Sequence, residues 1–144
     1  MSTVDMFTDG ACANNPGNGG WACILFYPSY KSYIAWKEIS GGEKNTTNNR
    51  MELMAVIKGL EALKEPCEVK VYTDSKYVSN AFNLNWISNW VLKNWGGVKN
   101  PDLWQRLLKL TQKHKVEFIW VKGHSDNKWN NRCDELAVKE SRSV

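Results

Sequence analysis

The chain has 144 residues, of which 42% are hydrophobic and 24% charged, and its formal net charge is +4. This is the composition of an ordinary globular domain, and it excludes a chain that is disordered throughout. The longest apolar run, residues 21–27, is far shorter than the roughly 20 residues of a membrane span, and the first residues lack the features of a secretory signal. We therefore expect a single domain over residues 1–144, located in the cytoplasm and without a membrane partner.

The first third of the chain has the composition of strands separated by turns. Residues 4–8 alternate and end at Asp9-Gly10, and residues 21–27 form an apolar run after a turn-rich segment. A third strand is predicted over residues 33–39, ending at Gly41-Gly42. The short connections predict an antiparallel meander.

Helical periodicity begins after the third strand. Apolar residues recur at helical spacing over residues 48–64, and Pro66 prevents continuation of that helix. The next elements are predicted as strand, helix, an ambiguous segment, helix, strand and helix, at residues 69–73, 76–81, 86–100, 101–114, 116–121 and 128–140. Helices between the later strands imply parallel crossovers, so the sequence predicts an α/β fold in which helices flank a mixed five-stranded sheet.

Four of the eight tryptophans occur close together in a polar and basic stretch: Trp86, Trp90, Trp95 and Trp104. A hydrophobic core does not require them in such surroundings, so they predict a contact surface. The positive net charge favours polyanionic partners, although charge alone does not identify one.

Four acidic residues are candidates for a common site: Asp9, Glu52, Asp74 and Asp134. Each has an ordinary structural explanation as a turn residue, a helix cap or a solvated charge. Asp9 and Asp74, however, both follow predicted strands, and they would share one sheet edge if these strands were parallel neighbours. Carboxylates held together repel one another unless a cation neutralises them, and two Mg²⁺ ions so bound can support phosphodiester hydrolysis.

Three further residues are candidates for a catalytic role. His124, in a glycine-containing loop, could transfer protons near neutral pH, although a loop histidine is more often only exposed. Cys12 and Ser75 are alternative nucleophiles, but neither has an identifiable base and orienting acid nearby in the sequence.

Six motifs together resemble those of a known family. They are Thr8-Asp9-Gly10, Asn15-Pro16-Gly17, residues 47–53 (TNNRMEL), Thr73-Asp74-Ser75, residues 121–124 (VKGH) and residues 131–137 (NRCDELA). In this order, over about residues 4–137, they closely resemble type I ribonuclease H of the bacterial type. The ribonuclease H-like fold implied by the resemblance is the same mixed sheet.

The resemblance implies hydrolysis of the RNA strand of an RNA–DNA hybrid, leaving a 3′-hydroxyl and a 5′-phosphate, with two Mg²⁺ or Mn²⁺ ions. Asp9 would bridge both ions. Asp74 and Asp134 would hold the ion that activates the attacking water, and Glu52 would hold the ion nearer the leaving group. His124 would assist proton transfer and product release.

The resemblance also implies residues that bind the substrate. Those matching contacts to the RNA strand are Asn15, Asn48 and Lys76, with Cys12 nearby, and those matching contacts to the DNA strand are Thr47, Asn49 and Trp86. Lys76 replaces the glutamine that is common in the family, and a cation at that position should add attraction to phosphate. We expect recognition through duplex shape and ribose 2′-hydroxyls, without sequence specificity, by a monomer.

Many bacterial relatives have a lysine-rich insertion corresponding to residues 86–100, whereas here this stretch is shorter and has two lysines. Weaker hybrid binding and a flatter salt dependence are expected.

Two alternatives stay open: another nuclease or transposase of the same fold, and a catalytically silent hybrid-binding module. The 47–53 block and the glycine-histidine loop disfavour the first alternative. The four intact acids disfavour the second, because their mutual repulsion in the absence of metal would be an unexplained loss of stability in a module that only binds the hybrid.

Overall fold

The computed structural model describes residues 1–27, 35–123 and 127–144. The elements are, in chain order, β1 (Ser2–Cys12), β2 (Gly17–Tyr27), β3 (Ala35–Thr46), α1 (Asn48–Glu61), β4 (Cys67–Thr73), α2 (Lys76–Asn83), α3 (Trp86–Leu92), α4 (Pro101–Lys113), β5 (Lys115–Trp120) and α5 (Lys128–Ser141). In the described part of the chain, no helix has the length and apolar character needed to cross a membrane.

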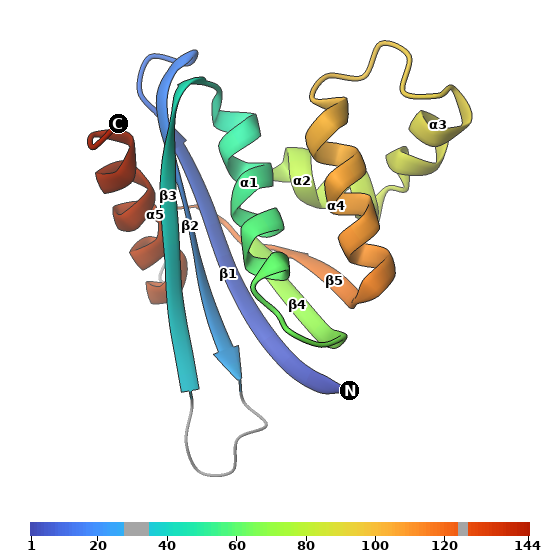
Figure 1. Ribbon diagram of the computed structural model, residues 1–144, viewed down its shortest axis with the longest axis horizontal. Coiled ribbons are helices and arrows are strands. Elements are labelled where there is room, and N and C mark those ends of the chain that lie inside the picture. Colours follow the sequence, from blue (N-terminus) through green and yellow to red (C-terminus); the bar gives the residue numbers. More distant parts are fainter. Residues whose placement is uncertain (28–34, 124–126) are drawn as a thin grey trace.

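The five strands form one sheet in the order β3-β2-β1-β4-β5 (Figure 1). β1 pairs with β2, and β2 with β3, in antiparallel fashion, whereas β1 pairs with β4, and β4 with β5, in parallel. The predicted mixed five-stranded sheet is thus confirmed. The parallel register brings Phe7 of β1 opposite Tyr72 of β4, which places the carboxyl end of β4 level with residues 8–9 inside β1.

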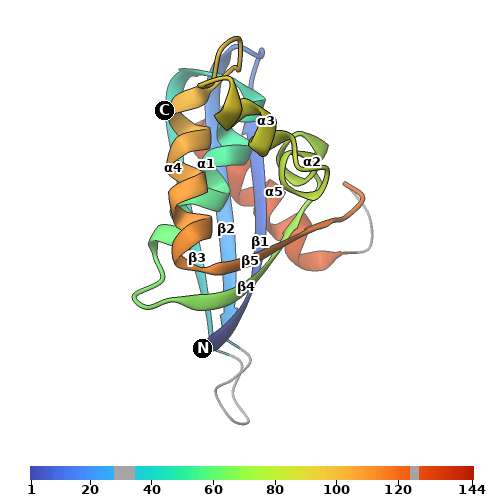
Figure 2. The same cartoon turned by 90° about the vertical axis from the view of Figure 1, so that its right-hand side faces the viewer.

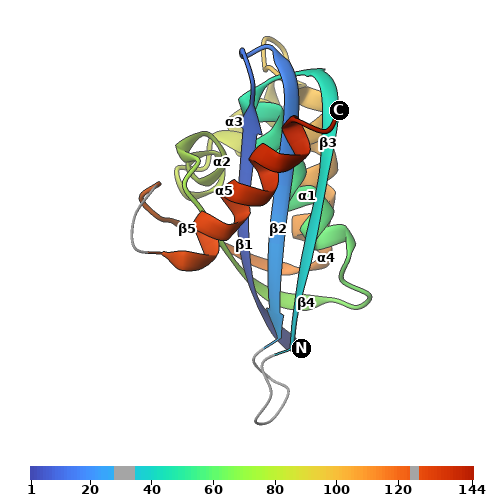
Figure 3. The same ribbon diagram turned by 90° about the vertical axis from the view of Figure 1, so that its left-hand side faces the viewer.

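Helices cover the two faces of the sheet unequally. α1 packs directly against β1 and β2, and α4 packs against α1, on the same side as α2 and α3 (Figure 2). On the other face, α5 crosses β1, β2 and β3 (Figure 3). The predicted apolar stripe of α1 is buried as expected, and a smaller core under α5 contains Ala22, Ile24, Phe26, Cys133 and Ala137.

Several predicted boundaries were wrong. β2 begins at Gly17, inside the segment predicted as a turn, and not at residue 21. β1 continues beyond Asp9-Gly10, because its ladder with β2 extends to the pair Cys12 and Gly19. β3 likewise continues past Gly41-Gly42 to Thr46, and α1 ends at Glu61, before Lys64. Hydrogen bonding to a neighbouring strand outweighs the turn preference of these glycines, so Asp9 lies inside a strand and not at its end. Residues 33 and 34 of the predicted third strand are outside the described residues.

The predicted tryptophan contact surface was wrong for Trp104, the last of its four members. The Trp104 side chain is fully buried, while Trp90 and Trp95 pack partly against the main core. Trp86 keeps 38% of its surface exposed. The ambiguous segment 86–100 folds as α3 followed by turns, and its aromatic side chains form an extension of the core under this helix.

Candidate active site

The two parallel central strands bring Asp9 and Asp74 to the same level of the sheet. Asp9 lies two positions beyond Phe7, and Asp74 lies two positions beyond its partner Tyr72. Asp9 is only 7% exposed and Asp74 is half-buried. Ser75 caps α2 by accepting a hydrogen bond from the backbone N–H of Val78, so the chain turns into a helix directly after Asp74.

Glu52 reaches the same place from α1. Thr47 caps this helix by accepting a hydrogen bond from the Arg50 N–H, and Glu52 follows within the next turn, 4% exposed. A Cβ atom at Gly10 would lie 2.5 Å from the Glu52 backbone nitrogen, so only glycine permits this contact between β1 and α1. The Gly10 N–H donates to carboxylate oxygens of both Asp9 and Glu52.

Three of the four predicted acids form a cluster. One oxygen each from Asp9, Glu52 and Asp74 lies within 4.8 Å of the others. Asp134, half-buried on α5, lies outside this group, although its negative charge acts on Asp9. His124 lies outside the residues that the structure describes.

Burial and mutual repulsion alter the titration of the cluster. Burial, followed by the charges of Asp74 and Asp134, raises the pKa of Asp9 from 3.8 to about 8. Burial, followed by the charges of Asp9 and Asp74, raises the pKa of Glu52 well above its ordinary value. Without a counter-charge, therefore, the cluster retains protons at neutral pH.

The cluster has the donor chemistry of a divalent metal site. Its three members offer only oxygen ligands, which Mg²⁺ and Mn²⁺ prefer. None of the ion pairs among the described residues involves these three side chains. A divalent cation would therefore replace the retained protons and offset the burial and the repulsion that raise both pKa values.

The residues predicted to contact an RNA strand fall into two groups, one where the β1–β2 turn meets the start of α1 and one at the start of α2. Asn15 accepts a hydrogen bond through its Oδ1 from the Asn48 N–H at 3.0 Å, so the β1–β2 turn meets the start of α1. Cys12 is half-buried, and its Sγ lies 3.4 Å from the Thr46 carbonyl oxygen. Lys76, at the start of α2, holds its ammonium group 5.0 Å from the centre of the Trp120 ring.

The residues predicted to contact a DNA strand are divided between two elements. Asn49 is exposed at the first turn of α1, next to the cap residue Thr47. Trp86 begins α3, where its ring packs at 6.4 Å from that of Trp90. The structure therefore brings Thr47 and Asn49 together and leaves Trp86 on a separate helix.

Two glycines at the site were not identified as functional from the sequence. In the sequence, Gly10 marks the predicted end of the first strand, and Gly123 belongs to the loop that carries His124. A Cβ atom at Gly123 would lie 2.8 Å from the Asp74 Oδ2. A glycine inside or next to a strand is a recognised sign of close approach, and this signal could have identified both.

Gly123→Ala is expected to weaken Mg²⁺ binding about tenfold, because the added methyl group displaces the Asp74 carboxylate from its position. The methyl group meets only the end of a flexible side chain, so the melting temperature in EDTA should stay that of the wild type. The measurement is the rise in melting temperature as Mg²⁺ is added. An unchanged Mg²⁺ dependence would contradict this role of Gly123.

Comparisons with known proteins match the whole chain. The sequence model of the family described as RNase H matches residues 1–142. Ribonuclease H of Caldanaerobacter subterraneus subsp. tengcongensis is 54% identical over 142 residues, which cover 95% of this chain and 90% of that protein. LC9-RNase H1, described as a type 1 RNase H with the type 2 active-site motif, superposes with a TM-score of 0.89 at 28% identity, over 99% of this chain and 73% of that chain. LC11-RNase H1 in complex with RNA/DNA hybrid shares the fold, with a TM-score of 0.69 at 23% identity over 97% of each chain.

Proposed function

The chain belongs to the RNase H family and is accordingly an endoribonuclease, and we propose that it hydrolyses the RNA strand of RNA–DNA hybrids to leave 3′-hydroxyl and 5′-phosphate ends. The observation that carries the proposal is the buried cluster of Asp9, Glu52 and Asp74, whose oxygens lie within 4.8 Å of one another. The hybrid bound by a solved protein of the same fold supports this substrate. We assign the activity to a single catalytic domain over residues 1–144.

The family uses divalent metal ions, and we propose two Mg²⁺ ions with Mn²⁺ as a substitute. Asp9, Glu52 and Asp74 would hold them, and Asp134 would add a carboxylate from α5. Bound divalent ions neutralise negative charge on the phosphodiester and lower the pKa of water. The Gly10 N–H orients the carboxylates of Asp9 and Glu52, and burial limits access of bulk water to them. His124 would transfer a proton at this site.

The residues around the cluster would bind the two strands differently. We propose that Asn15, Asn48 and Lys76 contact the RNA strand, with Cys12 nearby, and that Thr47, Asn49 and Trp86 contact the DNA strand. The hydrogen bond between Asn15 and the first turn of α1 supports a shared role, because it fixes the two asparagines side by side. Such contacts read duplex shape and 2′-hydroxyls, which gives hybrid selectivity without sequence specificity.

The deciding experiment is cleavage of an end-labelled RNA–DNA hybrid in Mg²⁺, beside double-stranded RNA and double-stranded DNA. Cleavage restricted to the RNA of the hybrid, and lost with EDTA and in Asp74→Asn, is the expected result. Hybrid binding is measured in parallel. Retained binding without any cleavage would instead assign the chain as a catalytically silent hybrid-binding module.

The two lysines between α3 and α4 are expected to contribute modestly to hybrid affinity. In Lys93→Ala/Lys99→Ala, the slope of log affinity against log salt concentration should become shallower by roughly one unit per lost phosphate contact. Both side chains are exposed in the wild type. Lys115→Ala, at the amino end of β5, is the matched control and should leave the slope unchanged. An unchanged slope in the double variant would exclude Lys93 and Lys99 from the binding surface.

We further propose a cytoplasmic monomer without a membrane partner, on the basis of the resemblance to the family. Light scattering coupled to size exclusion tests the oligomeric state. A dimer in that measurement would contradict the proposal.

A further inference from the structure

Trp120, the last residue of β5, contacts two residues of the segment that joins β4 to α2. Its indole Nε1 donates a hydrogen bond to the Asp74 backbone carbonyl oxygen at 3.0 Å. The Nζ of Lys76 lies 5.0 Å from the centre of the Trp120 ring, which is within the range of a cation–π interaction. One side chain therefore contacts both a member of the acidic cluster and a cation predicted to bind the RNA strand.

The pairing of β5 with β4 explains why Trp120 reaches this segment. Trp120 lies opposite Thr73, the last residue of β4, and the Val121 N–H donates to the Thr73 carbonyl oxygen at 2.9 Å. Side chains two positions apart in a strand share a face, so Trp120 lies on the same face as Phe118, whose ring stacks on that of Phe82 of α2. On this face of the sheet, the end of β5 meets the beginning of α2.

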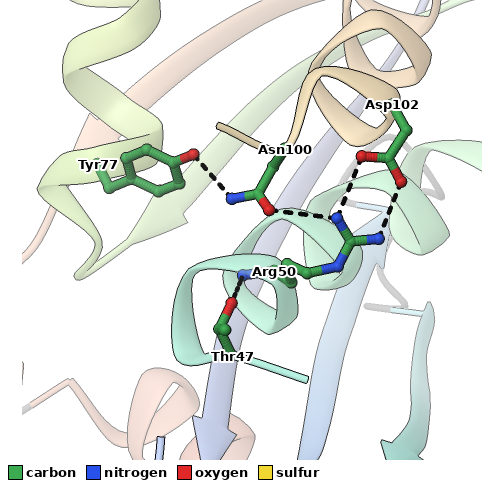
Figure 4. Close-up of polar contacts among 5 residues, drawn as sticks. All are labelled: Thr47, Arg50, Tyr77, Asn100 and Asp102. Atoms are coloured by element: carbon green, nitrogen blue, oxygen red, sulfur yellow. Dashed lines mark hydrogen bonds and ion pairs between the residues drawn. The ribbon is translucent and has the colours of Figure 1, made fainter. Parts of the chain in front are cut away.

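Hydrogen bonds hold the backbone on both sides of position 76. The Ser75 N–H donates to the Thr73 Oγ1 at 3.0 Å, and the Ser75 side chain caps α2. The Tyr77 hydroxyl accepts from the Asn100 Nδ2 at 3.1 Å (Figure 4). The Asn100 Oδ1 accepts in turn from Arg50 of α1 at 3.2 Å. The Lys76 side chain therefore extends from a backbone position that is already fixed.

The Lys76 side chain itself projects into solvent. It is exposed, and it forms none of the ion pairs among the described residues. A flexible lysine binds a phosphate more tightly when its ammonium group is held in place beforehand, because less conformational entropy is lost on binding. The ring of Trp120 provides such a restraint, and 43% of the Trp120 surface is exposed to the solvent from which a substrate would approach.

We propose that Trp120 is a positioning residue, which holds the Lys76 ammonium group for a phosphate of the RNA strand and fixes the Asp74 backbone beside it. The proposal rests on the proposed function, because that function supplies the RNA strand. It predicts two separable effects. The ring acts on substrate binding through Lys76, and the indole N–H acts on the acidic cluster through Asp74.

A double-mutant cycle on hybrid affinity tests the ring, with binding measured in EDTA so that the hybrid is not cleaved. Trp120→Thr removes the ring with a residue that favours strands, and Lys76→Met removes the charge but keeps an unbranched side chain. We expect affinity to fall about threefold in Trp120→Thr, about tenfold in Lys76→Met and about tenfold in the double variant. Trp120→Val replaces Trp120→Thr if the latter does not fold.

Two results of the cycle would overturn the link between Trp120 and Lys76. Losses that multiply to about thirtyfold in the double variant would show that the two side chains act independently. Tighter binding by Trp120→Thr than by the wild type would show that the ring holds the ammonium group away from the substrate.

Trp120→Phe tests the indole N–H, because phenylalanine keeps an aromatic ring beside Lys76 and removes the donor to the Asp74 carbonyl oxygen. Hybrid affinity in EDTA should stay within about twofold of the wild-type value. We expect kcat on the hybrid to fall about fivefold, and the Mg²⁺ concentration needed to raise the melting temperature of the protein alone to increase severalfold. An unaltered kcat and Mg²⁺ dependence would overturn the role of Trp120 in fixing Asp74.

Trp36→Phe is the matched control. Trp36 of β3 is 55% exposed, and its ring contacts those of Phe26 and Trp129 beside α5, on the other face of the sheet. This variant should bind Mg²⁺ and cleave the hybrid as the wild type does, and losses equal to those of Trp120→Phe would overturn the proposal. Absence of hybrid cleavage by the wild type would refute the proposed function, whereas the Mg²⁺ readout would still test the contact between Trp120 and Asp74.

Discussion

Asp9→Asn is expected to reduce cleavage of the RNA strand by about 10³-fold or more, because loss of one metal-binding carboxylate removes several kcal/mol of transition-state stabilisation. Asparagine has nearly the shape of aspartate, so the β1–β2 ladder should persist. The measurement is single-turnover cleavage of a labelled hybrid in Mg²⁺. Asp5→Asn, the same change earlier in β1, is the matched control and should cleave at the wild-type rate. Equal losses in the two variants would show that the effect does not arise in the acidic cluster.

The same Asp9→Asn substitution is expected to raise the melting temperature in EDTA. In the wild type, burial and the charges of Asp74 and Asp134 oppose ionisation of Asp9 and raise its pKa to about 8. At neutral pH the folded wild type therefore retains a proton that the unfolded chain releases, whereas asparagine is neutral in both states and removes this cost. A rise of about 5 °C is expected, which corresponds to 1–2 kcal/mol for a domain of this size. A lower melting temperature in the variant would mean that the carboxylate stabilises the metal-free fold.

The metal-free protein is expected to lose stability as the pH rises from about 4 to about 8. Below 3.8, the ordinary pKa, the Asp9 carboxyl is protonated in both the folded and the unfolded chain. Between 3.8 and about 8, the unfolded chain releases this proton while the folded chain retains it, so unfolding becomes more favourable. Glu52, whose pKa is also raised, contributes in the same direction. The total loss is on the order of a few kcal/mol.

Urea unfolding in EDTA measures this effect between pH 6.5 and about 8. Burial, followed by the charge of Lys113, lowers the pKa of His114. Titration of His114 therefore changes the stability in the opposite direction only at pH values below 6.5, the ordinary histidine pKa, which lie outside the measured range. Addition of Mg²⁺ should flatten the profile, because the folded chain then binds a cation through the ionised carboxylates. The same pH slope in EDTA and in Mg²⁺ would contradict a metal site at the cluster.

The elements of the fold were predictable where neighbouring residues determine them. The apolar stripe of α1, the Ser75 cap before α2 and Pro101 at the start of α4 are local signals, and each element formed as expected. The position of Asp9 at a strand end was wrong, because the ladder from β1 to β2 continues to Cys12. Trp104 was predicted to lie on a contact surface, yet its side chain is buried against Trp90 of α3, and its Nε1 donates a hydrogen bond to the Tyr77 hydroxyl. Both errors arise from contacts between elements.

The sequence by itself determined the α/β elements, the motifs of the RNase H family and the four candidate acids. Only the tertiary structure decided that Asp9, Glu52 and Asp74 meet within 4.8 Å while Asp134 remains outside this group. It also decided that Gly10 permits the approach of α1 and that Asn100 connects two helices. The physical reason is the range of the interactions. Periodicity and capping act between residues a few positions apart, whereas the hydrogen bond from Gly10 to Glu52 spans 42 positions and forms only when β1 and α1 pack together.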